Sequence, residues 1–252
     1  VDMMSDGRLD FGIARGAYQS EFDRMTDQMT AKEGGGPLRE MIPALQKLWT
    51  GDYAHDGEHY SFPTSTAVPR ATQKPFPPMW VAAREQESHD YAVENDCNVM
   101  VTPLIAGDAS IEMACQRFKQ ACTNHPDKPT PQVLALRHTW VHEETEDWQR
   151  GAQALRDWYA YFYAWFKNEQ TPKEGFIQPL TDAQMDELPG FGLDELHDNL
   201  LIGTPAQVTK RIKHYESLGV TQFSFWSDNG LPHAEKKKSL QLFIDKVMPN
   251  FN

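Results

Sequence analysis

The sequence predicts an α/β fold built on a parallel sheet. Short apolar, β-rich runs alternate with helical patterns along the 252 residues, and strands that alternate with helices pair in parallel. With 40% hydrophobic and 24% charged residues, the chain can bury a sizeable core, so we predict one domain over 1–252. Five runs predict strands, at 9–13, 79–83, 98–102, 133–141 and 221–226.

Apolar residues at helical spacing predict the intervening helices. They are expected over 37–49, 85–95, 110–123 and 148–167, from Pro205 to the residue before Gly219, and over a last helix that ends before Pro249. Thr204 is a suitable cap for the helix that begins at Pro205, and Gly219 a suitable stop.

Two segments interrupt this alternation. The stretch 53–78 contains His-Asp-Gly, aromatic residues and several prolines, which predicts a turn or short hairpin. The stretch 168–199 is rich in Gly, Pro and acidic residues. A loop of this length is a lid, a binding loop or disordered, and we predict a lid.

Composition excludes several classes of partner and site. The net charge of -12 argues against binding to nucleic acid or to an anionic membrane. There is no apolar run of roughly 18 residues and no signal-peptide pattern, so we predict a soluble, cytoplasmic protein. Three cysteines without a C-x-x-C pair and nine histidines without metal-ligand spacing predict neither disulfide nor metal.

Arg15 is the most informative candidate for a binding residue. The apolar run 9–13 leads to this arginine, which stands between Gly12 and Gly16. Ligands of alternating β/α proteins bind where the strands end, and an arginine there suits a phosphate. The competing interpretation is a solvated or salt-bridged surface arginine.

The number of strands predicts an incomplete barrel. A closed parallel barrel needs eight β/α units of roughly 30 residues, and only five strands are predicted here. The first three units, about 90 residues, are therefore expected to be absent. A fragment of a longer polypeptide and a natural short form whose open edges a partner chain covers both remain open.

A series of short motifs in a fixed order resembles the bacterial luciferase-like flavin-dependent monooxygenases. The motifs are SDGRLDFGIARG (5–16), EF (21–22), LW (48–49), HDGEHYSF (55–62), PMWVAA (78–83), WY (158–159), GTP (203–205) and VMP (247–249). The resemblance implies a (β/α)8 TIM barrel of the luciferase-like type. It also implies that reduced FMN binds at the carboxyl ends of the strands.

The resemblance implies particular cofactor contacts. Arg15 and Arg39 are similar to the two arginines that meet the flavin phosphate, and Ser88 to a hydroxyl that contacts it. Ala83 and Arg84 lie at the strand end beside them. Where many relatives have a serine, this chain has Arg84-Glu85, and we expect Glu85 to point away from the phosphate or to pair with Arg84. Ser88 could equally cap its helix.

Trp158 and Trp226 are the predicted substrate-pocket residues. Trp158, with Tyr159, matches an aromatic pair that in the family lies near the flavin ring, and Trp226 ends the last predicted strand. The catalytic residue stays unknown, because the catalytic histidine of relatives would lie in the absent N-terminal part. None of the nine histidines is assigned its role.

The implied function is a monooxygenase that uses reduced FMN and O2 on a small organic substrate. Gly190-Phe191-Gly192 lacks the third glycine of a nicotinamide-binding motif, so a separate flavin reductase is expected as partner, and a homodimer as assembly. The alternatives are an oxidoreductase that uses the deazaflavin F420, a non-catalytic luciferase-like subunit, and an unrelated barrel such as an aldolase. No predicted strand contains the lysine that an aldolase needs.

Overall fold

The computed structural model describes residues 1–143 and 148–251. These residues divide into two compact units, which we describe separately. Unit 1 comprises Val1–Met100 and Arg117–Pro131, and unit 2 comprises Val101–Gln116 and Gln132–Asn252. The single domain therefore stays a prediction.

Unit 1 contains three parallel strands. Strand β4 pairs with β1 on one side and with β5 on the other. Its elements are β1 (Phe11–Ile13), α1 (Gln19–Met25), α2 (Gly35–Thr50), β2 (Asp52–Asp56), β3 (Ser61–Thr66), β4 (Met79–Ala82), α3 (Gln86–Glu94), β5 (Asn98–Val101, its last residue in unit 2) and the second part of α4 (Asp108–Asn124). The predicted strands at 9–13, 79–83 and 98–102 are confirmed within two residues at each end.

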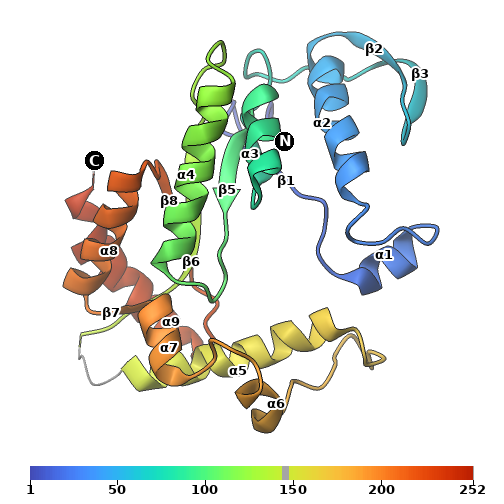
Figure 1. Ribbon diagram of the computed structural model, residues 1–252. Helices are drawn as coiled ribbons and strands as arrows, with labels where there is room; N and C mark the ends of the chain where they lie inside the picture. Colours follow the sequence, from blue (N-terminus) through green and yellow to red (C-terminus); the bar gives the residue numbers. More distant parts are fainter. Residues whose placement is uncertain (144–147, 252) are drawn as a thin grey trace. The chain divides into compact units, whose positions relative to one another are not determined.

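Unit 1 also contains a hairpin, which lies between β1 and β4 in the order of the chain. Strands β2 and β3 are antiparallel, and they lie beside α2 (Figure 1). The Glu40 carboxylate on α2 accepts hydrogen bonds from the backbone N–H of His59 and Tyr60 at the hairpin turn, both at 2.9 Å. The hairpin predicted within 53–78 is confirmed.

Unit 2 is built around the long strand β6, which pairs in parallel with β7 and β8. Its elements are the first part of α4, β6 (Val133–Val141), α5 (Trp148–Lys167), α6 (Asp182–Asp186), α7 (Leu193–Asn199), β7 (Leu201–Gly203), α8 (Pro205–Leu218), β8 (Gln222–Trp226), α9 (His233–Leu242), a π-helical turn (Phe243–Val247) and a 3-10 turn (Met248–Asn250). Sequence analysis missed β7, because three residues are too few to show a strand pattern.

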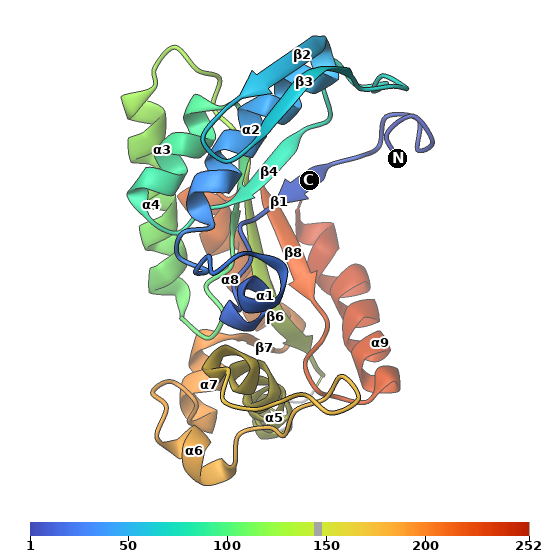
Figure 2. The same cartoon turned by 90° about the vertical axis from the view of Figure 1, so that its right-hand side faces the viewer.

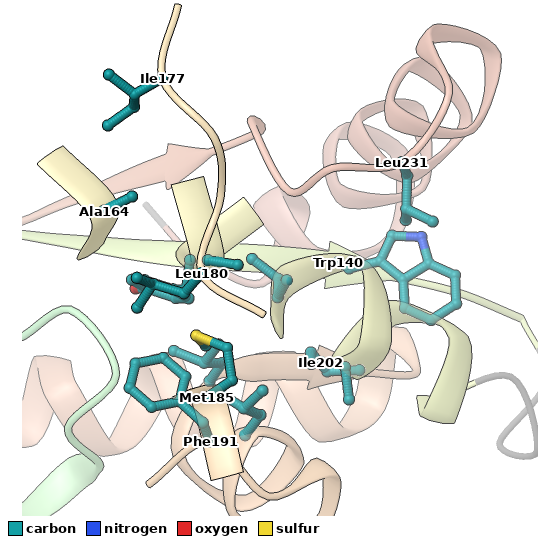
Figure 3. Packing of buried hydrophobic residues seen from close by; sticks show 14 residues of the cluster. Trp140, Ala164, Ile177, Leu180, Met185, Phe191, Ile202 and Leu231 are labelled. Atoms are coloured by element: carbon teal, nitrogen blue, oxygen red, sulfur yellow. The ribbon is translucent and has the colours of Figure 1, made fainter. Parts of the chain in front are cut away.

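The stretch 168–199 is not an open loop. It contains α6 and α7, and α5 and α7 pack together (Figure 2). Leu180, Met185 and Phe191 join the buried cluster of α5 (Figure 3). Widely spaced apolar residues anchor this segment, although its composition is that of a loop. Its role as a lid stays a prediction.

The mixed α/β fold with parallel strands is confirmed, and so are the helices predicted between them. The last predicted helix corresponds to α9, which begins at His233 and continues into the π-helical turn up to Val247, and the 3-10 turn that follows includes Pro249. No described helix is both long enough and apolar enough to cross a membrane.

Candidate functional site

The strand register in unit 1 places two predicted site residues at the same height along the parallel strands. Ile13 of β1 lies beside Val81 of β4, so Arg15 and Ala83 each follow two residues later, where the parallel strands end. Ala83 is buried, and its N–H donates to the Met100 carbonyl at 3.2 Å. Arg15 therefore lies at the carboxyl edge of this sheet, as the sequence predicts, which is the edge where parallel β/α proteins bind their ligands.

Arg15 is partly engaged by the chain itself. Its Nη1 donates to the carbonyls of Ala31, at 2.9 Å, and Lys32, at 3.4 Å. Within the described residues its Nε and Nη2 make no hydrogen bond. The bonds to the two carbonyls hold the guanidinium in place and leave two nitrogens for an anion.

A hollow of about 430 Å³ adjoins Arg15. Its walls are mostly apolar and include Phe22, Leu38 and Met41, and His59 also lines it. This volume falls within the usual range of small-molecule sites, and a mainly apolar wall with a few polar groups is typical of them.

Arg39 lies on α2 and does not line this hollow. Its Nη2 is 2.9 Å from Oε1 of Glu87 on α3, and its side chain is 46% exposed. An exposed pair of this kind contributes little to stability, so the guanidinium can exchange partners at small cost. Its role at a phosphate stays a prediction.

Ser88 stabilises the start of α3. Its hydroxyl accepts hydrogen bonds from the backbone N–H of Glu85, at 3.1 Å, and of Arg84, at 3.3 Å, and donates to the Glu85 carbonyl at 2.9 Å. Glu85 pairs with Arg117, at 3.2 Å, and not with Arg84. Arg117 also donates to the Arg84 carbonyl at 2.6 Å. These bonds stabilise the start of α3, as the capping alternative for Ser88 predicts.

The two predicted substrate-pocket residues lie close together in unit 2. The ring centroids of Trp158 on α5 and Trp226 at the end of β8 are 5.4 Å apart, at an interplanar angle of 81°. Trp158 Nε1 donates to Oδ2 of Asp228 at 3.0 Å, and Lys236 Nζ donates to Oδ1 at 2.7 Å. The hydrogen bond from Lys236 lowers the pKa of Asp228. Asp228 thus fixes Trp158 to the segment that follows β8.

His138 belongs to this aromatic group, and sequence analysis missed it. It lies on β6 directly beside Trp226 in the strand register, and its ring stacks on Trp226 at 3.8 Å. It is only 1% exposed. Burial, together with the charge of Arg137, lowers its pKa to about 3. The signal available in the sequence was a histidine inside an otherwise β-rich run.

Comparisons with known proteins agree with this architecture. The family model described as luciferase-like monooxygenase matches residues 1–222. The "Flavin-dependent trigonelline monooxygenase, oxygenase component" of Acinetobacter baylyi is 45% identical over all 252 residues, which correspond to 70% of that protein.

Two solved structures are similar in fold. An F420-dependent secondary alcohol dehydrogenase, in complex with an F420-acetone adduct, is 15% identical with a TM-score of 0.74, covering 98% of this chain and 70% of its own. The oxygenating constituent of 3,6-diketocamphane monooxygenase from Pseudomonas putida, in complex with FMN, is 15% identical with a TM-score of 0.70. The match covers 100% of this chain and 73% of that structure's chain. At these identities the likeness shows the fold alone.

Proposed function

The chain belongs to the luciferase-like monooxygenase family, and on that premise we propose that it is an oxygenase component that uses reduced FMN and O2 to oxygenate a small organic substrate. The observation that supports this most is the 45% identity, along the whole chain, to the oxygenase component of a flavin-dependent monooxygenase. An oxygenase component needs a second protein that supplies reduced flavin. The proposed partner is therefore a separate flavin reductase.

The residues around Arg15 fit the phosphate end of FMN. The guanidinium has two nitrogens without partners in the described part of the chain, beside a hollow of about 430 Å³. A guanidinium matches a phosphate through paired hydrogen bonds. We assign the phosphate contact to Arg15, with Ala83 and Arg84 alongside it at the end of β4.

Arg39 and Ser88 are proposed as further phosphate contacts. Each would have to break an existing interaction with the chain in order to bind the phosphate. Arg39 would leave Glu87, and the Ser88 hydroxyl would redirect one of its bonds at the start of α3. Both changes involve exposed or partly exposed groups, so they cost little.

When bound, reduced FMN supplies the electrons that activate O2, so that one oxygen atom enters the substrate and the other leaves as water. The contribution of the chain is to bind and to exclude solvent. Trp158 and Trp226 are proposed as the wall on which the substrate lies, and the segment 168–199 as a lid that keeps water out.

The test is turnover with the full polypeptide and chemically reduced FMN. Trigonelline, the substrate named for the relative, serves as the probe. It is added to the protein with reduced FMN, and O2 is then mixed in. The expected result is O2 consumption and a product that contains one oxygen atom from 18O2, detected by mass spectrometry. Turnover with reduced F420 and without O2 would instead establish the deazaflavin alternative. Failure to bind any flavin would favour a non-catalytic subunit.

The remaining proposals concern the setting of this reaction. We propose a closed (β/α)8 barrel for the working enzyme, a homodimer and a cytoplasmic location, as the resemblance implies. Light scattering after gel filtration should give twice the mass of the polypeptide, and a monomer mass would contradict the dimer.

A further inference from the structure

His138 lies between the two tryptophans that are proposed to form the substrate wall. Its imidazole stacks on Trp226, with centroids 3.8 Å apart and planes at 15°, and meets Trp158 edge-on at 4.7 Å and 66°. Because His138 and Trp226 are also direct neighbours in the strand register, the backbone sheet holds the stacked pair. The imidazole therefore occupies the angle between the two indole rings.

The imidazole is uncharged in this position. The titratable groups around it are Arg137 on its own strand, Tyr159 on α5, at 5.2 Å between ring centroids, and Asp228 after β8. Burial and Arg137 lower the pKa of His138 to about 3, while Asp228 opposes them. The ring is thus neutral at neutral pH.

Stability alone does not account for a histidine here. By strict hydrogen-bond geometry neither ring nitrogen of His138 has a partner among the described residues, and the Asp228 backbone acts on its pKa only as a weak hydrogen-bond partner. Burying polar atoms without partners is unfavourable, and a leucine or phenylalanine would avoid that cost. The stack on Trp226 is what distinguishes this histidine from the similarly buried His89.

We propose that His138 is a positioning residue of the substrate pocket, whose flat ring sets the angle between Trp158 and Trp226 and thereby the shape of the wall that selects the substrate. The inference rests on the proposed function and deepens it. The hydrogen bond from Trp158 to Asp228 fixes one indole ring, and the stack with His138 fixes the other.

The experiment compares three variants of the full polypeptide. His138→Leu removes the flat ring, His138→Phe keeps a flat ring without nitrogens, and His89→Leu is the matched control. His89 is also fully buried, has ring nitrogens without hydrogen-bond partners in the described residues, and has its pKa lowered to about 4 by burial. It lies on α3 in unit 1, outside the aromatic group.

The readouts are near-UV circular dichroism, melting temperature and steady-state kinetics with the probe substrate of the preceding assay. His138→Leu should change the tryptophan dichroism and lower kcat/KM by about tenfold or more, mainly through KM, without lowering the melting temperature. His138→Phe should recover much of the dichroism and of kcat/KM. His89→Leu should leave the tryptophan dichroism and kcat/KM unchanged.

Three outcomes would overturn the proposal: wild-type dichroism and kcat/KM in His138→Leu, equal losses in His89→Leu, and a pH profile of kcat/KM that loses an ionisation in His138→Phe. The last would make the imidazole an acid or base rather than a positioning group. The dichroism needs no substrate, so it tests the positioning role even if wild-type protein fails to oxygenate the probe and the proposed function is wrong.

Discussion

At the scale of single residues, Arg15 is held in place by the chain itself. Two loop carbonyls bind one of its nitrogens, and two others are left without partners in the described residues. A guanidinium that is already held in this way loses less conformational entropy when it binds an anion. Arg15 is therefore the residue whose removal should affect flavin affinity most.

Arg15→Ala should weaken binding of reduced FMN by about 1.5–3 kcal/mol, the scale of a charge-assisted hydrogen bond. Anaerobic titration followed by flavin absorbance measures the affinity. Arg8→Ala is the matched control, because Arg8 lies on the same N-terminal segment and its Nε donates only to the Ser5 carbonyl. Equal affinity in Arg15→Ala and wild type would refute the phosphate assignment.

Glu40 illustrates how one carboxylate can fix a hairpin. Desolvation raises its pKa, but hydrogen bonds from the His59 backbone, the His55 ring and the Tyr60 backbone outweigh it and lower the pKa to about 2. A lowered folded-state pKa stabilises the fold above the ordinary value near 4.5, and this stabilisation is lost as pH falls toward 2.

Glu40→Gln should therefore be less stable than wild type at pH 7, and the difference should shrink as pH falls from about 4.5 to about 2. Urea unfolding at several pH values measures this. Glu58→Gln is the control, because Glu58 is an exposed carboxylate at the same hairpin turn. A difference that is independent of pH would show that the charge of Glu40 is not what holds the turn.

At the scale of elements, α5 organises much of unit 2. It contributes Leu155, Tyr159 and Ala164 to a buried cluster that also takes in Phe191 and Leu196 from the segment after it. Phe191 is 1% exposed and packs edge-on against Tyr159 and Tyr163. The segment 168–199 is thus attached to the helix by its core side chains, and any lid motion must leave these contacts intact or break them at high cost.

Phe191→Ala should destabilise the protein by about 3–5 kcal/mol, through lost burial and the cavity left behind. Phe176→Ala, in the same segment, should change stability by no more than about 0.5 kcal/mol, since Phe176 is 76% exposed. Chemical denaturation of both variants provides the comparison. Similar small effects at both positions would mean that the core side chains of the segment do not anchor it to α5.

At the scale of the whole molecule, the proposed reaction depends on a second protein. The chain has a glycine pair at Gly190 and Gly192, but these lie beside α7 within the segment 168–199 and not between a strand and a helix that binds a dinucleotide. The net charge of -12 also disfavours close approach of highly anionic molecules that have no dedicated pocket. NADH should therefore not reduce flavin on this chain directly.

NADH and oxidised FMN together should give no oxygenation of a substrate that chemically reduced FMN allows the chain to oxygenate. Adding an unrelated flavin reductase should restore turnover, because free reduced FMN can diffuse between the two proteins. Oxygen consumption and product formation measure both steps. Turnover with NADH alone, after removal of any contaminating reductase, would contradict the two-component proposal.

The parallel α/β pattern, the hairpin and the position of Arg15 at a strand end could be predicted from the sequence, because they follow from local periodicity and from residues next to one another in the chain. The luciferase-like family was likewise evident from the ordered motifs, and the family model and the relatives confirm it. The cofactor and pocket roles of individual residues stay predictions.

The contacts between side chains follow from the three-dimensional structure and not from the sequence pattern. The pairing of Arg39 with Glu87, the anchoring of 168–199 on α5 and the place of His138 between Trp158 and Trp226 all join residues distant in the sequence. Such contacts depend on strand register and on the packing of helices against one another. Neither leaves a periodic signal that one sequence can show.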